Sequence, residues 1–292
     1  MLACLAGARL ACNGERSRTT PQSAESLSGP GPDIAAAPAC HASGARRPMK
    51  ILIISDLHAN LEALRALPSD YDELWALGDL VNYGPNPSEV IEFVRRRASL
   101  VVRGNHDDAI GYDRDPVCSP PFRVLAAETG RFTQSVLSGE QKQFLRALPL
   151  MASREACGLR FLACHATPED PLHEYRPADS ALWAGGPGLL PYDVLLSGHT
   201  HIPVHRRISG RLIVNPGSVG QSKTVGGRAF YAILEDGQVS LRSVEYPVEE
   251  TVAKLQALPL PPEVTTKLAT VLRTGSLPPE DAAPPTGPAA KS

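Results

Sequence analysis

The stretch that decides the fold is Lys50-Ile51-Leu52-Ile53-Ile54-Ser55-Asp56-Leu57-His58. Four Ile and Leu residues follow one lysine, and such a short apolar run is typical of a β-strand. The run ends in an Asp-x-His motif, so two side chains able to ligate a metal come directly after the strand. Leu61, Leu64 and Leu67 then recur at helical spacing. The segment therefore predicts a strand, a polar loop and a helix.

The same alternation continues toward the C-terminus. Residues 73–77 and 99–103 form two further apolar runs, and a helix is predicted between them up to Arg97. Asn86 is expected to cap this helix and Pro87 to occupy its first turn, where a missing N–H costs nothing. The order is βαβαβ, which indicates a mostly parallel sheet with right-handed crossovers.

The second half is richer in strands. Residues 122–148 predict two helices broken near Ser138-Gly139, and residues 248–257 and 262–273 predict two more. Strands are predicted at 158–164, 193–197, 204–208, 211–214, 228–235 and 238–246. Ser209-Gly210 and Asp236-Gly237 are two-residue hairpin signals, so antiparallel pairing is expected here.

Composition excludes some classes of protein. The 292 residues carry a formal net charge of -2, so no overall positive field exists to hold nucleic acid. No apolar run approaches the roughly 18 residues that span a bilayer. Six cysteines without Cys-x-x-Cys spacing indicate free thiols rather than a disulfide scaffold. A cytoplasmic protein with no membrane or nucleic-acid partner is expected; its oligomeric state is left open.

The two ends differ from the middle. Residues 1–48 are rich in Ala, Gly, Ser, Pro and Arg without any sustained period, which predicts a disordered leader. A mis-annotated start is the alternative, with Met49 as the authentic first residue. A targeting peptide is a third explanation, but the segment lacks a cationic n-region. Residues 49–274 are predicted to form the folded domain and residues 275–292 a disordered tail.

Five short motifs carry the chemistry. They are Asp56-Leu57-His58, Gly78-Asp79, Gly104-Asn105-His106-Asp107, His165 and Gly198-His199-Thr200-His201. Each follows a predicted strand, and in open α/β sheets the loops at the carboxyl ends of the strands converge on the ligand site. Any one of these motifs alone is weak evidence. Their joint occurrence predicts a two-metal site, and its ligands, free of thiolate, suit Mn, Fe, Zn, Co or Ni.

These motifs, in this order, resemble those of the calcineurin-like metallophosphoesterases, and the resemblance covers Met49 to about Gly275. It implies an α/β fold: a four-layer α/β/β/α sandwich with two mixed central sheets. By this resemblance one metal takes Asp56, His58, Asp79 and His201, and the other takes Asp79, Asn105, His165 and His199. Asp79 would bridge two divalent ions, for which the family favours Mn.

The resemblance also implies a mechanism. Two ions about 3.5 to 4 Å apart lower the pKa of a shared water, and the resulting hydroxide attacks phosphorus in line. His106 matches the family's non-ligand histidine, which stabilises the transition state and protonates the leaving oxygen. Asp107 is expected to hold the imidazole of His106, with a turn cap as the alternative.

The branch of the family follows from what comes after Asp79. The chain has Leu80-Val81-Asn82-Tyr83-Gly84-Pro85 in place of the Asp-Arg-Gly of the protein phosphatases. This loop, together with residues 55–64 and 215–221, resembles the small bacterial and archaeal phosphodiesterases. Their substrates are small-molecule phosphodiesters or phosphomonoesters, nucleotides included. The loop 215–221 is expected to be either an anion-binding nest or a plain turn.

Two rival hypotheses remain. One is a non-catalytic interaction module that binds metal on the same fold; such proteins tend to lose ligand histidines or the counterpart of His106. The other is a purely structural metal site, which would not need His106 and Asp107 or open coordination positions. No ligand motif is missing here, which favours the enzyme.

Overall fold

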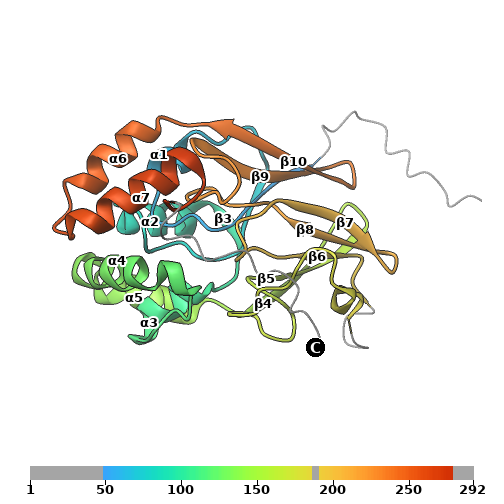
Figure 1. Ribbon diagram of the computed structural model, residues 1–292. Helices are drawn as coiled ribbons and strands as arrows, with labels where there is room; N and C mark the ends of the chain where they lie inside the picture. Colours follow the sequence, from blue (N-terminus) through green and yellow to red (C-terminus); the bar gives the residue numbers. More distant parts are fainter. Residues whose placement is uncertain (1–48, 186–190, 279–292) are drawn as a thin grey trace, which may run out of the picture. The chain divides into compact units, whose positions relative to one another are not determined.

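The structure is a computed structural model that describes residues 49–185 and 191–278. The predictions for residues 1–48 and for the tail from residue 279 lie outside the described residues. Ten strands in two sheets and seven α-helices account for the described part of the chain (Figure 1).

The first sheet has the order β10-β9-β1-β2-β3. Its strands are β1 (Lys50–Ile54), β2 (Glu73–Ala76), β3 (Ala98–Val101), β9 (Arg228–Glu235) and β10 (Gln238–Glu245). β1, β2 and β3 are parallel, as the βαβαβ order predicts, whereas β9 runs antiparallel to both β1 and β10. The sheet is therefore mixed, and the prediction of a mostly parallel sheet holds only for its first three strands.

The second sheet has the order β4-β5-β6-β8-β7. Its strands are β4 (Met151–Ala156), β5 (Leu159–Cys164), β6 (Val194–Leu196), β7 (Val204–Ile208) and β8 (Arg211–Asn215). β5, β6 and β8 are parallel, and antiparallel strands lie at both edges. The hairpins predicted at Ser209-Gly210 and Asp236-Gly237 connect β7 to β8 and β9 to β10, and both are confirmed.

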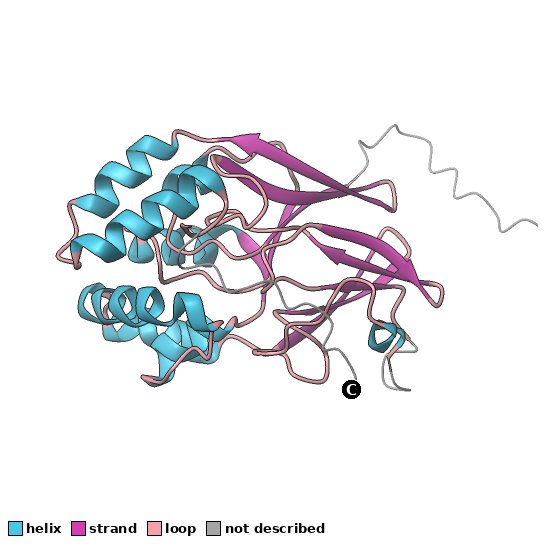
Figure 2. Cartoon of the chain, viewed as in Figure 1, coloured by secondary structure: helices cyan, strands magenta, loops and turns pink. Residues whose placement is uncertain are grey.

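The helices gather at one side of the strands (Figure 2). They are α1 (Leu61–Arg65), α2 (Pro87–Arg97), α3 (Asn105–Tyr112), α4 (Arg123–Val136), α5 (Gly139–Ala147), α6 (Val248–Gln256) and α7 (Pro262–Thr274), with short 3-10 turns η1 (Pro120–Phe122) and η2 (Ala181–Ala184). None of the helices within residues 49–185 and 191–278 is long and apolar enough to cross a bilayer.

Alternation along the strands builds two apolar layers. Ile51 and Ile53 of β1 face the second sheet, where the rings of Trp75 and Phe161 meet edge to face at 5.2 Å. Leu52 and Ile54 point the other way, into a cluster with residues of α1 and α2. Each fully buried large side chain stabilises the fold by about 1.5 to 3 kcal/mol. The predicted pair of mixed sheets is confirmed, and it forms a rigid frame beneath the loops.

Three local predictions differ from the structure. The helix α3 was not predicted, because its sequence has only a weak apolar face and begins inside a ligand motif. The strand β4 was not predicted, because at the edge of its sheet it buries no residue fully. Asn86 occupies the N-cap of α2, but its side chain donates to Glu89 rather than capping the helix backbone.

Candidate metal centre

The seven predicted metal ligands meet at the carboxyl ends of the parallel strands. Each of them is at most 3% exposed. They come from loops after β1, β2, β5 and β6 and from the first turn of α3, and they are Asp56, His58, Asp79, Asn105, His165, His199 and His201. The tertiary structure therefore brings together residues up to 145 positions apart in sequence.

The backbone is strained where it presents these ligands. Asp56, His58, Asp79, His199 and His201 all have φ between 44° and 65°. This left-handed region costs a non-glycine residue on the order of 1 to 3 kcal/mol. Such strain persists only where the surrounding structure imposes it, and here it falls on five of the seven predicted ligands. The strain marks this loop cluster as a functional site.

Two glycines let the loops approach closely enough. A Cβ on Gly104 would lie 2.1 Å from Oδ1 of Asp79, and one on Gly198 would lie 2.0 Å from Oγ of Ser55. Neither position accepts any side chain. The loops that carry the ligands therefore require glycine at both positions.

The first ligand group contains Asp56, His58, Asp79 and His201, whose ligand atoms all lie within 4.8 Å of one another. Nε2 of His58 lies 3.1 Å from Nε2 of His201, and Nε2 of His201 lies 3.2 Å from Oδ1 of Asp56. Oδ1 of Asp56 is buried without a hydrogen-bond partner. A cation between these atoms would satisfy all of them.

The second ligand group contains Asp79, His165 and His199, again with ligand atoms within 4.8 Å. Oδ1 of Asn105 lies 3.1 Å from Nε2 of His165 and 3.1 Å from Nδ1 of His199, so it joins this group as an amide oxygen ligand. Oδ2 of Asp79 lies 3.3 Å from His165 and 3.7 Å from His58. Asp79 thus belongs to both groups, as a bridging carboxylate must.

Backbone carbonyls fix the tautomer of every ligand histidine. The nitrogen that faces away from the centre donates to a carbonyl oxygen: His58 to Val81 at 3.1 Å, His165 to Leu77 at 2.8 Å, His199 to His173 at 3.2 Å and His201 to Gln221 at 2.5 Å. Each remaining ring nitrogen therefore points a lone pair at the centre. This arrangement is the usual support of metal-ligating histidine.

The buried carboxylates and imidazoles of the centre shift one another's pKa values. Burial favours the neutral form of Asp79, yet the nearby His165 and His106 hold its pKa well below the usual range. Burial also lowers the pKa of His165, but the charge of Asp79 outweighs it and raises that pKa to about 9. The carboxylate of Asp79 thus stabilises positive charge at this position. The donor set and its geometry fit two divalent cations.

His106 lies beside the metal ligands without joining them. Nδ2 of Asn82 lies 2.8 Å from Nδ1 of His106 and 3.2 Å from the carbonyl oxygen of Ala126. Because a carbonyl only accepts, the amide nitrogen must face both atoms, and Nδ1 must accept. The proton of His106 then sits on Nε2. Burial lowers the pKa of His106 to about 4, so the ring is neutral near pH 7.

Asp107 does not hold His106, contrary to the first expectation. Its carboxylate accepts from the backbone N–H groups of Asp79 at 2.8 Å, Leu80 at 2.8 Å and Gly104 at 3.0 Å. It therefore caps the loops that carry Asp79 and begin α3, which was the alternative. Asn82 holds the imidazole instead.

The loop 215–221 is a brace and not an anion-binding nest. The hydroxyl of Ser218 donates to the carbonyl of Asp56 at 2.8 Å, and the N–H of Gly220 donates to the same oxygen at 2.9 Å. The N–H of Val219 donates to Ser55 at 3.0 Å. These donors already form hydrogen bonds within the protein, so none of them is available for an anion. The loop is therefore a plain turn, which was the alternative. The loop supports Asp56, and through Gln221 it also supports His201.

A lysine that lines the site was missed by sequence analysis. Lys223 lines the same small pocket as Asp79, His106, His199 and His201, together with Tyr83, Phe122 and Tyr175. Its Nζ lies 5.1 Å from the ring centre of Phe122 and 5.9 Å from that of Tyr175. Burial lowers the pKa of Lys223. A basic residue two positions after a Gly-rich loop is the signal that would have found it.

Comparison with known proteins agrees with this geometry. Residues 49–236 match the calcineurin-like phosphoesterase superfamily domain. The protein MJ0912 of Methanocaldococcus jannaschii is 31% identical over 240 residues, covering 72% of this chain and 93% of that protein. Phosphodiesterase YfcE of Escherichia coli K12 is 28% identical over 210 residues, covering 66% of this chain and 91% of that protein.

A solved structure gives the same result in three dimensions. The crystal structure of a metallophosphoesterase from Sphaerobacter thermophilus superposes with a TM-score of 0.63 at 34% identity, covering 77% of this chain and all of that one. The strand-end ligands, their shared carboxylate and these likenesses lead to one conclusion. The chain belongs to the calcineurin-like phosphoesterase superfamily, a family of metal-dependent hydrolases of phosphoester bonds.

Proposed function

We propose that this protein hydrolyses small-molecule phosphodiesters or phosphomonoesters at a two-metal centre. The proposal depends mainly on the observation that Asp79 belongs to both ligand groups. One ion would be held by Asp56, His58, Asp79 and His201, and the other by Asp79, Asn105, His165 and His199. When bound, the two ions supply positive charge for the phosphate oxygens and ionise the attacking water. Mn²⁺ is the metal that we propose first, with Fe, Zn, Co and Ni as the others to test.

His106 supplies the proton. Its Nδ1 accepts from Asn82, so Nε2–H is the group available to a leaving oxygen. The ring lies 5.2 Å from the ring of His58, centre to centre, which supports a role for His106 beside the proposed ligands. Donation from a positioned histidine typically contributes 10²- to 10⁴-fold to the rate.

Lys223 supplies a further positive charge for the phosphate. The chain lacks the arginine of the protein phosphatases, and Lys223 lines the pocket beside the metal ligands. The rings of Tyr83, Phe122 and Tyr175 line the same pocket, and aromatic faces suit a flat leaving group such as a nucleobase or a phenol. This lining supports a small-molecule phosphoester, nucleotides included, as the substrate class.

The proposal also includes the cellular compartment and the boundaries of the catalytic domain. Cys118, Cys157 and Cys164 are free thiols, which suits a reducing cytoplasm. Residues 49–274 would form the catalytic domain, since they contain every proposed ligand and the helices α6 and α7 that pack on it.

The test is hydrolysis of bis-p-nitrophenyl phosphate by the full chain. Activity should appear with Mn²⁺, disappear with a chelator and return when Mn²⁺ is restored. A panel of mono-, di- and cyclic nucleotides then identifies the substrate class. A protein that binds two metals yet leaves every phosphoester intact would instead be an interaction module on this fold.

A further inference from the structure

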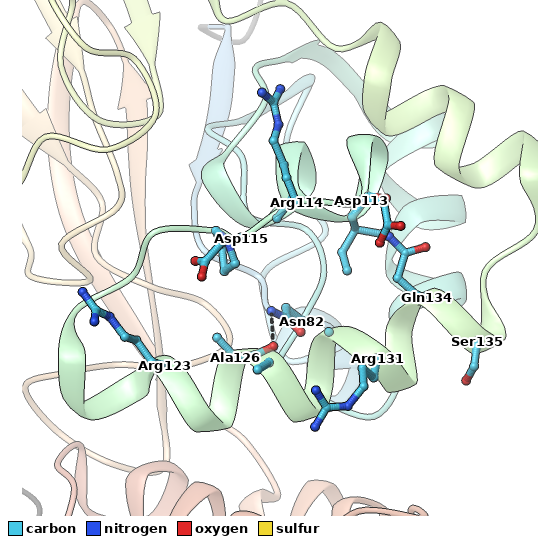
Figure 3. Close-up of a pocket in the computed structure, with 14 residues that line it drawn as sticks. Asn82, Asp113, Arg114, Asp115, Arg123, Ala126, Arg131, Gln134 and Ser135 are labelled. Atoms are coloured by element: carbon cyan, nitrogen blue, oxygen red, sulfur yellow. Dashed lines mark hydrogen bonds between the residues drawn. The ribbon is translucent and has the colours of Figure 1, made fainter.

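A larger cavity lies beside the metal centre, between α3 and α4 (Figure 3). Its volume is about 480 Å³, within the range of roughly 300 to 1,000 Å³ that small-molecule sites occupy. No proposed metal ligand lines it. Its floor is Asn82, the residue that holds His106 from the other side.

The floor presents an unused hydrogen-bond acceptor. Asn82 is 1% exposed, and its Oδ1 has no hydrogen-bond partner among the described residues. The amide cannot rotate to relieve this, because its nitrogen is committed to His106. The same nitrogen also donates to the carbonyl of Ala126, the contact drawn in Figure 3. A buried acceptor left unpaired costs about 1 to 3 kcal/mol. Oδ1 is therefore poised to accept from an N–H group of a bound molecule.

A glycine of α4 lies over this acceptor. A Cβ on Gly130 would lie 3.7 Å from Oδ1 of Asn82 and 3.9 Å from Ile110, so a longer side chain would cover the floor. Glycine inside a helix costs about 1 kcal/mol relative to alanine. Ala109 and Ala127 add further small, apolar wall on the two helices. The cavity suits a flat apolar body that ends in an N–H donor.

The rim carries charges of both signs. Arg123 has no ion pair among the described residues, whereas the other two rim arginines are committed, Arg114 to Asp108 and Arg131 to Glu128. Arg123 is thus a free guanidinium for an anion. The carboxylates of Asp113 and Asp115 also line the rim. Carboxylates accept well from hydroxyl groups of a sugar.

We propose that this cavity binds a nucleoside monophosphate whose base carries an amino group. The amino group donates to Oδ1 of Asn82, the base packs between α3 and α4, the ribose hydroxyls donate to the rim carboxylates, and the phosphate pairs with Arg123. Binding here is independent of the phosphoesterase activity. The ligand nevertheless contacts the residue that holds the proposed proton donor His106.

The test is calorimetric titration of AMP into the full chain with chelator present, so that no hydrolysis occurs. Ala127→Phe fills the cavity and should weaken AMP binding at least tenfold. Val124→Phe adds the same ring to the same helix at a position that is 64% exposed and outside the cavity lining, and it should leave binding unchanged. Arg123→Gln should weaken AMP about tenfold but leave adenosine unchanged.

Two further comparisons test the hydrogen bond to Asn82 and show whether AMP binding depends on the proposed metal centre. Purine riboside 5′-monophosphate lacks the amino group and should bind at least tenfold more weakly than AMP. Asp79→Asn, which disrupts the proposed metal centre, should leave AMP binding intact. The proposal is overturned if AMP fails to bind at millimolar concentration, if Ala127→Phe binds it like the unmodified chain, or if Asp79→Asn abolishes binding. None of these outcomes depends on whether the protein hydrolyses phosphoesters.

Discussion

Nδ2 of Asn82 lies 2.8 Å from Nδ1 of His106, and this contact decides which nitrogen of the ring carries a proton. The two residues are 24 positions apart, on the loop after β2 and on the first turn of α3. A ring held in this way carries its proton on Nε2. Asn82, and not Asp107, is therefore the residue that holds the imidazole of His106.

Replacing Asn82 tests that role. Asn82→Leu keeps the volume but removes the donor, so His106 loses its fixed tautomer. We expect kcat to fall about 10- to 100-fold, the usual effect of losing a supporting hydrogen bond at a metal site. Metal content, measured by mass spectrometry, should be unchanged. Asn86→Ala removes a half-buried asparagine side chain from the same segment, remote from His106, and should leave kcat as it was.

His106→Ala tests the proton donor itself. We expect hydrolysis of bis-p-nitrophenyl phosphate to fall by about 10² or more while both metals stay bound. His106 contributes no atom to either ligand group, so metal loss would show that it has a different role. Unchanged turnover would remove the residue from the mechanism.

Metal stoichiometry tests the shared carboxylate. His199 belongs to one ligand group, whereas Asp79 belongs to both. We expect two Mn²⁺ per unmodified chain, about one in His199→Ala, and close to none in Asp79→Ala. Equal losses in the two variants would argue against a bridging role. The measurement is metal content after equilibrium dialysis.

Lys223→Gln tests whether the lysine that lines the pocket contributes to substrate binding. The side chain lines the pocket but is not a metal ligand, so we expect kcat/KM to fall about tenfold, which corresponds to about 1.4 kcal/mol. The dependence of kcat/KM on ionic strength should also weaken, because one attractive charge is gone. Arg206→Gln removes an exposed cation from β7 and serves as the matched control.

Glu62 should make stability depend on pH. It is 5% exposed on α1, accepts from Thr251 of α6 at 3.0 Å and pairs with Lys254. Burial favours its neutral form, but these two partners lower its pKa below 4.5 in the folded chain. The ionised carboxylate of Glu62 therefore adds to the free energy of unfolding above pH 4.5. This stabilisation is lost as pH falls through the folded-state pKa.

Urea unfolding of Glu62→Gln provides the measurement. At pH 7 we expect a loss of about 1 kcal/mol in the free energy of unfolding, the scale of a net hydrogen bond. The difference from the unmodified chain should shrink below pH 4.5. Glu250→Gln removes an exposed charge from α6 and should show neither effect. A difference that stays constant with pH would exclude the ion pair as its cause.

Local sequence determined most of the elements. The helix from Pro87 to Arg97 and the hairpin turn at Asp236-Gly237 follow from proline placement, turn chemistry and apolar periodicity within a few residues. The strand β4 was not predicted, because an edge strand that buries no residue fully shows no apolar alternation in its sequence. The helix α3 was not predicted, because candidate ligands rather than an apolar face occupy its first turn.

The sequence by itself determined which side chains gather at the strand ends, since each ligand motif directly follows an apolar run and parallel strands present their carboxyl ends together. Only the tertiary structure decided what supports them. Asn82 rather than Asp107 holds His106, Lys223 lines the pocket, and Ser218 braces Asp56. These contacts join residues 24 or more positions apart, and their geometry depends on how strained loops pack above two sheets, which no local pattern encodes.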